Sequence, residues 1–226
     1  MKKDIVVKYH GFKFLTDEWM GSRMLVNKYE VEEVKLIDYI PNIETLSVLE
    51  LGGCLGVVSV VLNSKLNNPS KHVVVEANPK LIRYLEHNRE VNNCSYNILN
   101  GLLTTNSNNN IFYSYDKLVA GSAHRLDDSK ETNKTEHIVD TFTISEIESK
   151  YKTEFNLLVM DIEGGELEFL NEFPTLNFKY ILVELHQFIM PGIPNFNNKC
   201  LAKFKDRGYT RMQALGNSFL LKKEAN

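Results

Sequence analysis

Residues 48–60, VLELGGCLGVVSV, decide the fold of this chain. An apolar run ends at Leu51, a glycine-rich turn occupies 52–56, and a second apolar run begins at Val57. Glycines at the turn from a strand into a helix let backbone amides approach a ligand closely, and the N-terminus of the helix adds partial positive charge. The stretch therefore predicts a strand, a ligand-binding turn and a helix in succession.

The spacing of these glycines does not fit the dinucleotide fingerprint. Counted from Gly52, the pattern G-x-G-x-x-G requires glycines at the positions of Cys54 and Val57. An oxidoreductase with a nicotinamide cofactor is therefore the less favoured alternative. What the turn retains is an acid before the first glycine and a later glycine, namely Glu50, Gly52 and Gly56. The carboxylate of Glu50 stands at the strand end, where it suits a cationic or amine-bearing ligand.

A second acid ends the next apolar run. Residues 72–76 read HVVVE, so Glu76 stands at the end of the second predicted strand. In the nucleotide-binding half of a doubly wound sheet, a carboxylate at this place accepts hydrogen bonds from a ribose diol. Together with the glycine turn, Glu76 predicts a nucleoside ligand, and a tight turn without a ligand is the alternative.

Short apolar runs alternate with helical patterns from residue 46 onward, which is typical of a parallel sheet with crossover helices. The predicted strands are 46–51, 72–76, 96–99, 156–161 and 180–185, and the predicted helices are 56–66, 79–91, 145–150, 165–172 and 198–207. Residues 208–222 contain the turn pair Gly216-Asn217 and predict a terminal antiparallel hairpin. The fold class is α/β, doubly wound and mostly parallel.

The sequence contains no repeat and no linker, so residues 1–226 are expected to form one domain. Residues 1–45 are an entry segment with a predicted strand at 5–9 and a helix at 30–40. Residues 101–136 interrupt the alternation with polar and turn-forming residues around one apolar run, 111–115. We expect an irregular insertion there with a single strand, and we expect the entry segment and the insertion to select the acceptor.

The composition disfavours several classes of partner. Lys and Arg number 26 and Asp and Glu 29, a formal net charge of −3, so no surplus of cations is available to neutralise nucleic-acid phosphates. No apolar run approaches the roughly 18 residues of a membrane helix, and the N-terminus lacks the apolar region of a secretory signal. We expect a cytoplasmic protein that binds neither nucleic acid nor membrane. Its widely separated cysteines, Cys54, Cys94 and Cys200, are expected to be free thiols.

Four segments together resemble the class I S-adenosylmethionine-dependent methyltransferases, and within them the FkbM-type family. They are VLELGGCLGVVSV (48–60), VVVEANPKLIRYLEHNREVN (73–92), LLVMDIEGGELEFL (157–170) and ILVELH (181–186), and NKYEVEEVKLIDYI (27–40) is similar to the family's entry segment. The pattern D-x-E-G-x-E from Asp161 is the most specific. The chain departs from the family at Cys54, where Asn is common, and at Val159, where Lys is frequent.

This resemblance implies a Rossmann-like, seven-stranded sheet with an antiparallel C-terminal hairpin. It also implies transfer of a methyl group from S-adenosylmethionine to a hydroxyl of a small molecule or saccharide. The implied contacts at the methionine end of the cofactor are Glu50 on the amino group and the turn residues Gly52, Gly53, Cys54 and Gly56. The implied contacts at the adenosine end are Glu76 on the ribose hydroxyls, Ala77 and Asn78 beside the adenine, and Asn100 and Gly101 at its edge.

The chemistry is expected where the fourth and fifth strands end. Asp161 and Glu163 follow one strand, and His186 closes the next. The attacking hydroxyl loses its proton, so a general base is useful. His186 titrates nearest neutral pH, whereas Asp161 is better placed by the motif and could instead touch the cofactor. Glu163 is the third catalytic candidate, although Glu163 and Glu166 also suit the start of a helix.

Two further alternatives concern this acidic cluster. Carboxylates and an imidazole suit several metal ions, but Asp161, Glu184 and His186 lack a tight ligand spacing, so no metal is expected. A binding module that keeps the cofactor fold without its chemistry is the second alternative. The presence of both Asp161 and His186 speaks against it.

Overall fold

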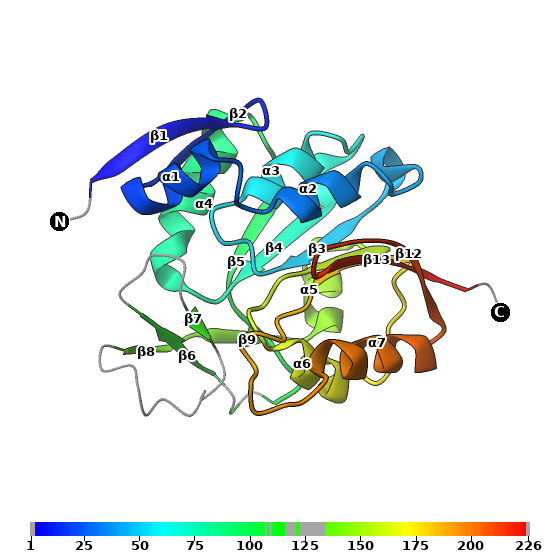
Figure 1. The fold of residues 1–226 in the computed structure, drawn as a ribbon. Helices are drawn as coiled ribbons and strands as arrows, with labels where there is room; N and C mark the ends of the chain where they lie inside the picture. The colour runs from blue at the N-terminus through cyan, green and yellow to red at the C-terminus, as the bar shows by residue number, and fades with distance from the viewer. Residues whose placement is uncertain (1–2, 107, 109, 116–120, 123–133, 225–226) are drawn as a thin grey trace.

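A mixed eight-stranded sheet forms the centre of the molecule (Figure 1). The structure is a computed structural model that describes residues 3–106, 108, 110–115, 121–122 and 134–224. The strand order is β12-β13-β11-β10-β3-β4-β5-β9. The bounds are β3 Val48–Leu51, β4 His72–Glu76, β5 Asn97–Leu103, β9 Asp140–Phe142, β10 Leu157–Met160, β11 Tyr180–Glu184, β12 Tyr209–Leu215 and β13 Ser218–Lys223.

The strand pairing confirms the predicted fold class. β9, β5, β4, β3, β10 and β11 run parallel, and β13 pairs antiparallel with β11 and with β12. Seven of these strands are the predicted sheet and its terminal hairpin. The eighth, β9, was not predicted, because three residues are too few to show an alternating pattern. It pairs with the end of β5, which extends to Leu103, beyond the predicted end at 99.

Helices cover both faces of the sheet, which explains the continuous apolar strands. Every residue of β3, β4 and β10 is buried. One core cluster joins α2, α3 and α4 to the sheet, and the other joins α5, α6 and α7 to its opposite face (Figure 1). The bounds are α2 Val31–Ile37, α3 Val57–Asn63, α4 Pro79–Val91, α5 Ile144–Tyr151, α6 Glu166–Glu172 and α7 Phe196–Asp206, with short 3₁₀ turns at Ile43–Thr45 and Pro69–Lys71.

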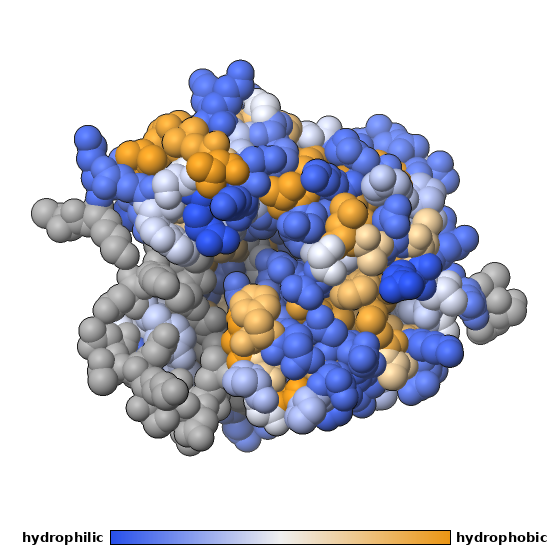
Figure 2. Space-filling view, in the orientation of Figure 1, coloured by the Kyte–Doolittle hydropathy of each residue, from blue (hydrophilic) through white to orange (hydrophobic). Residues whose placement is uncertain are grey.

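The entry segment adds a hairpin and a helix outside the sheet. β1 (Asp4–Tyr9) pairs antiparallel with β2 (Phe12–Asp17), and α1 (Glu18–Leu25) begins where Asp17 accepts a hydrogen bond from the Met20 amide. The strand at 5–9 and the helix at 30–40 were predicted, whereas β2 and α1 were not. Apolar surface gathers over this hairpin and α1 in Figure 2, where Val6 and Leu25 are exposed.

The insertion forms a small sheet of its own. β6 (Ile111–Ser114) pairs antiparallel with β7 (Gly121–Ser122) and β8 (Thr135–Ile138). The strand predicted at 111–115 is confirmed, and its two partners were not predicted. Residues 107, 109, 116–120 and 123–133 of this insertion lie outside the described residues. In the part of the chain that the structure describes, no helix is long and apolar enough to cross a membrane.

The chain order of the strands reverses at β3. From β3 the connections lead outward through β4 and β5 on one side and through β10 and β11 on the other. Loops leaving the carboxyl ends of β3 and β10 therefore diverge and leave a crevice, which is where ligands bind in open α/β sheets. The glycine turn and the D-x-E-G-x-E segment both begin at this crevice.

Candidate active site

The glycine turn packs directly against the end of β10. Gly52 has φ +85°, and a Cβ built on it would collide with the carbonyl oxygen of Asp161. Gly56 has φ +80° and stands at the N-cap of α3. Cys54, at φ +47°, lies between them, and the Tyr29 hydroxyl lies 3.0 Å from its Sγ. Tyr29 of the entry segment thus contacts Cys54, the residue at which this turn departs from the family pattern.

Glu76 fastens the end of β4 to the glycine turn. Its Oε2 accepts a hydrogen bond from the Cys54 amide at 2.8 Å, and its Oε1 accepts one from the Asn78 amide at 2.7 Å. Burial raises the pKa of Glu76 to about 7, and the two backbone hydrogen bonds oppose that shift. Because a carboxylate has about four lone-pair sites, both oxygens can still accept hydrogen bonds from a ligand.

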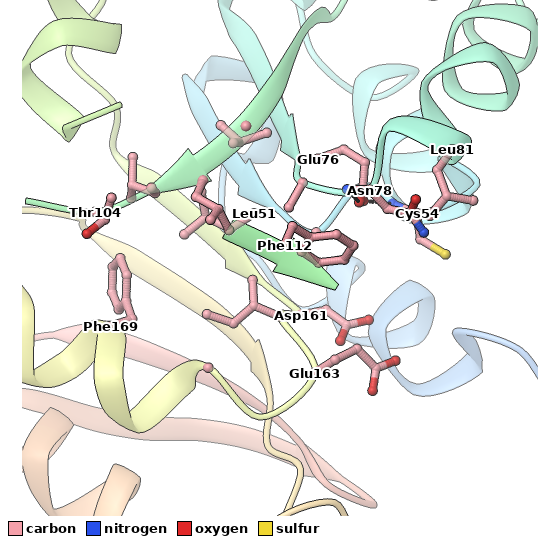
Figure 3. Close-up of a pocket in the computed structure, with 18 of the residues that line it drawn as sticks. Leu51, Cys54, Glu76, Asn78, Leu81, Thr104, Phe112, Asp161, Glu163 and Phe169 are labelled. Atoms are coloured by element: carbon pink, nitrogen blue, oxygen red, sulfur yellow. Dashed lines mark hydrogen bonds between the residues drawn. The ribbon is translucent and has the colours of Figure 1, made fainter. Parts of the chain in front are cut away.

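A cavity runs along the strand ends between these groups (Figure 3). Its polar wall carries Glu76, Asp161 and Glu163, while Phe112 and Phe169 are aromatic members of its lining. The other lining residues are Tyr29, Leu51, Gly52, Cys54, Val75, Ala77, Asn78, Leu81, Gly101, Leu102, Leu103, Thr104, Ile162, Gly165, Glu168 and Glu172.

The structure divides the predicted cofactor residues into two groups. Those that line the cavity are Gly52, Cys54, Glu76, Ala77, Asn78, Gly101 and Asp161. Those absent from the lining are Glu50, Gly53, Gly56 and Asn100. Gly53 faces Val74, and Asn100 donates to the carbonyl oxygens of Glu76 and Ala77, at 2.8 and 3.3 Å. Asn100 lies inside β5 rather than after the third strand, because that strand is longer than predicted.

Glu50 lies beneath the turn. Its Oε2 is 2.8 Å from Nε2 of His72, and its Oε1 accepts a hydrogen bond from the Ser59 hydroxyl at 2.7 Å. The carboxylate is 2% exposed and borders a second, smaller cavity behind Gly52 instead of the main one. The sequence placed Glu50 correctly at the strand end, but the partners His72 and Ser59 depend on tertiary packing.

His186 is the centre of an acidic cluster at the ends of β10 and β11. The ring is 2% exposed, and its Nδ1 lies 2.6 Å from Oε1 of Glu166. Its Nε2 lies 3.4 Å from Asp161 Oδ1, 3.6 Å from Glu163 Oε2 and 3.9 Å from Glu184 Oε2. The structure therefore brings together all three predicted catalytic residues. Glu166 is the first residue of α6, as the sequence suggested, and its carboxylate is also the partner of His186 Nδ1.

Burial and neighbouring charges shift the pKa values of this cluster. Burial raises the pKa of Asp161 well above its ordinary value, and the neighbouring charges of Glu184 and Glu163 add to the effect. Burial lowers the pKa of His186, but the hydrogen bond to Glu166 and the surrounding carboxylates outweigh it and raise that pKa to about 9. Asp161 and His186 therefore hold a proton more tightly than a free carboxyl group or imidazole does, which makes each a stronger base once it is deprotonated.

Sequence reasoning missed two acids of the entry helix. Glu30 accepts a hydrogen bond from the Val58 amide at 3.1 Å, and the Ser218 hydroxyl donates to Glu33. Both border the smaller cavity, together with Glu50, Asp161 and Glu184. A signal was available, because Glu33 stands four residues before Ile37 and so lies on the buried face of the helix.

It also missed the aromatic residues of the cavity. Phe112 comes from β6 of the insertion, and Phe169 from α6. Phe112 stood in the one apolar run predicted within the insertion, but its position over the cavity depends on how the small sheet docks.

The sheet order, the glycine turn and the acid at the end of β4 define a class I S-adenosylmethionine-dependent methyltransferase, and S-adenosylmethionine is its cofactor. The family model of the methyltransferase FkbM domain matches residues 50–211. The chain therefore belongs to the FkbM methyltransferase family, as its resemblance implied. No curated protein matches the sequence.

Solved structures agree on the fold. Precorrin-6y C5,15-methyltransferase from Geobacter metallireducens superposes with a TM-score of 0.51 at 13% identity, over 93% of this chain and 95% of that one. A candidate RNA methyltransferase from Pyrococcus horikoshii gives 0.51 at 13% identity, over 88% and 83%. A candidate caffeoyl-CoA O-methyltransferase from Staphylococcus aureus gives 0.51 at 12% identity, over 85% and 82%. These proteins share the sheet, and their names cover different acceptors.

Proposed function

We propose that the chain transfers the methyl group of S-adenosylmethionine to a hydroxyl of a small molecule or saccharide. The observation that carries the proposal is the cavity itself. Its wall includes a carboxylate suited to a ribose diol at Glu76, and it reaches Asp161 and Glu163, which lie beside the buried His186. A nucleoside site and a group of proton acceptors thus share one cavity.

The cofactor contacts follow from the chemistry of the lining. Glu76 accepts the ribose hydroxyls, since its oxygens keep free lone pairs beside the bonds to Cys54 and Asn78. Ala77 and Asn78 flank the adenine, and Phe112 and Phe169 supply the apolar contact surface that an aromatic base requires. When bound, S-adenosylmethionine supplies an electrophilic methyl group on a positively charged sulfur.

The catalytic roles fall to the cluster around His186. Glu166 fixes the orientation of the imidazole through Nδ1, while Asp161 and Glu163 border the cavity where the acceptor hydroxyl would lie. We assign to Asp161, Glu163 and His186 as a group the tasks of orienting that hydroxyl and receiving its proton. Holding the hydroxyl in line with the methyl group contributes to the rate as well, because proximity removes an entropic cost.

The charge of the site favours a neutral or cationic acceptor over RNA. The side chains of Asp161, Glu163 and Glu184 are 23%, 47% and 27% exposed, and Asp161 and Glu163 border the main cavity. Carboxylates at this edge repel the phosphates of a nucleic acid. Sugars and small polyols carry hydroxyls without such charge.

Titration calorimetry with S-adenosylhomocysteine tests the cofactor site. We expect saturable binding to the wild type and a loss of at least tenfold in affinity for Glu76→Ala. Glu86→Ala changes an exposed acid on α4 and should bind as the wild type does. Absence of binding by the wild type, or identical binding by Glu76→Ala, would refute the site.

Transfer of a radioactive methyl group tests the acceptor class. The wild type is incubated with labelled S-adenosylmethionine and with separate pools of saccharides, small hydroxyl compounds and total RNA. We expect label in a hydroxyl compound as an alkali-stable methyl ether. Label in RNA alone would replace the proposed acceptor, and cofactor binding with no transfer to any pool would favour a binding module.

A further inference from the structure

Three donor atoms converge at the ends of β10 and β11. One donor atom each from Asp161, Glu163 and His186 lies within 4.8 Å of the other two. Nε2 of His186 is 3.4 Å from Asp161 Oδ1 and 3.6 Å from Glu163 Oε2. These separations exceed the 2.7–3.2 Å of an ordinary N–H···O hydrogen bond. The imidazole nitrogen and the two carboxylates therefore face one another without a direct hydrogen bond between them.

The separations match the edges of a coordination polyhedron. Two ligands bound to one ion at ~2.1 Å in tetrahedral geometry stand about 3.4 Å apart. The distances of 3.4 and 3.6 Å from Nε2 agree with that edge. The third pair of donor atoms, on Asp161 and Glu163, lies within 4.8 Å, so an ion held by all three draws the two carboxylates toward each other.

An orphaned oxygen marks the same point. Among the described residues, Oδ1 of Asp161 is buried and has no hydrogen-bond partner. Buried polar atoms are almost always paired, because an unpaired one loses its hydration without compensation. This is the oxygen that faces Nε2 of His186, a ring that is itself 2% exposed. A partner placed between the carboxylate and the imidazole would satisfy this oxygen.

The far side of the imidazole is arranged as in metal sites. Glu166 is fully buried, and its Oε1 lies 2.6 Å from Nδ1 of His186. A carboxylate bonded to one ring nitrogen directs the lone pair of the other nitrogen outward and increases its basicity, as for many metal-bound histidines. In this ring, that outward nitrogen is Nε2, which faces Asp161 and Glu163.

We propose that Asp161, Glu163 and His186 bind one divalent transition-metal ion, such as Mn²⁺ or Zn²⁺. Two carboxylates and an imidazole suit these ions better than Mg²⁺ or Ca²⁺, which prefer oxygen ligands throughout. Three protein ligands leave coordination positions open toward the cavity, which Asp161 and Glu163 line. The role of the ion rests on the proposed function: in an open position it binds the acceptor hydroxyl and makes it more acidic.

The first measurement uses the metal alone. Wild-type protein is dialysed against a chelator, returned to chelator-free buffer, and titrated with Mn²⁺ by electron paramagnetic resonance and with Zn²⁺ by calorimetry. We expect one ion per chain with a dissociation constant below about 100 μM. No saturable binding of either ion by the folded wild type would overturn the proposal.

Variants then locate the site. We expect Asp161→Asn and His186→Gln to lower Mn²⁺ affinity at least tenfold, and Glu166→Gln to lower it 10- to 100-fold through His186. Asp206→Asn removes an exposed acid on α7 and should bind as the wild type does. Circular dichroism establishes that each variant is folded. Wild-type affinity in folded Asp161→Asn would overturn the assignment.

Failure of this inference is distinguishable from failure of the proposed function. Methyl transfer at an undiminished rate in chelator-treated protein, with no ion bound, would overturn the role of the ion in the reaction and leave the methyltransferase intact. Binding of one Mn²⁺ at Asp161 without transfer to any hydroxyl compound would support the metal site and overturn the proposed acceptor.

Discussion

At the scale of single residues, Gly52 and Glu76 connect the strand ends on which the site is built. Gly52 combines a positive φ with direct contact between the end of β3 and the backbone of Asp161. Glu76 accepts two backbone hydrogen bonds from different loops. Both residues are predicted from the sequence to contact a ligand. The structure adds that each also holds two strand ends together.

The first prediction concerns Gly52→Ala. The added methyl group collides with the Asp161 carbonyl, and alanine resists a φ of +85°, so we expect a loss of stability of at least about 2 kcal/mol. Thermal unfolding measures it. Gly192→Ala is the matched control, because nothing lies within 4 Å of a Cβ at that position. Equal melting temperatures for the two variants would show that β3 and β10 do not meet as described.

The second prediction separates the two possible roles of Glu50. Glu50→Gln weakens the buried pair with His72, so we expect it to destabilise the fold by about 1–3 kcal/mol. S-adenosylhomocysteine affinity, measured at a temperature where the variant is folded, should change less than threefold. A loss of affinity of tenfold or more with unchanged stability would instead support the contact between Glu50 and the methionine amino group that the family resemblance implies.

At the scale of elements, the insertion and the segment before α2 add residues to a cavity that otherwise lies along the ends of the central strands. β6 brings Phe112 to the cavity, and the segment leading into α2 brings Tyr29 to Cys54. Neither residue belongs to a glycine turn or an acidic motif. Both residues lie in segments that we expected to select the acceptor. The structure instead places both in the lining of the cavity proposed to bind the cofactor.

The third prediction tests this contribution of β6. Phe112→Ala removes an aromatic wall of the cavity, so we expect S-adenosylhomocysteine to bind about tenfold more weakly. The measurement is calorimetric titration. Ile138→Ala is the matched control, since Ile138 lies in β8 of the same small sheet and is 79% exposed. Equal affinities for both variants would place the adenine away from Phe112.

At the scale of the whole molecule, buried carboxylates make stability depend on pH. Burial raises the pKa of Glu30 from 4.5 to about 8 and that of Glu76 from 4.5 to about 7. In the unfolded chain both groups titrate near 4.5, so between that pH and about 8 the folded chain holds more protons than the unfolded one. Their contribution to stability is therefore complete below pH 4.5 and is lost as pH rises through 7 and 8.

The fourth prediction follows from that sign. We expect the melting temperature of the cofactor-free chain to fall as pH rises from 5.5 to 8.5, and the decline to be smaller in Glu30→Gln. Differential scanning calorimetry at constant ionic strength measures both. A melting temperature that rises over this range would mean that the surroundings of Glu30 and Glu76 do not raise their pKa values as described.

Most of the fold was predictable because its signals are local. The five parallel strands and five helices predicted from residue 46 onward appear within about four residues of their observed ends. The exceptions are short or polar elements. β9 has three residues, and β7 and β8 lie among polar residues, so backbone pairing with a neighbouring strand rather than a hydrophobic pattern decides them.

The sequence by itself determined the parallel sheet, the glycine turn, the acid at the end of β4 and the family, because each is written in contiguous residues whose periodicity or spacing constrains the backbone directly. Only the tertiary structure decided which side chains meet. It turned Glu50 toward His72, joined Glu166 to His186, and brought Phe112 over the cavity. The physical reason is that these contacts join separate elements, so they depend on strand order, helix packing and burial.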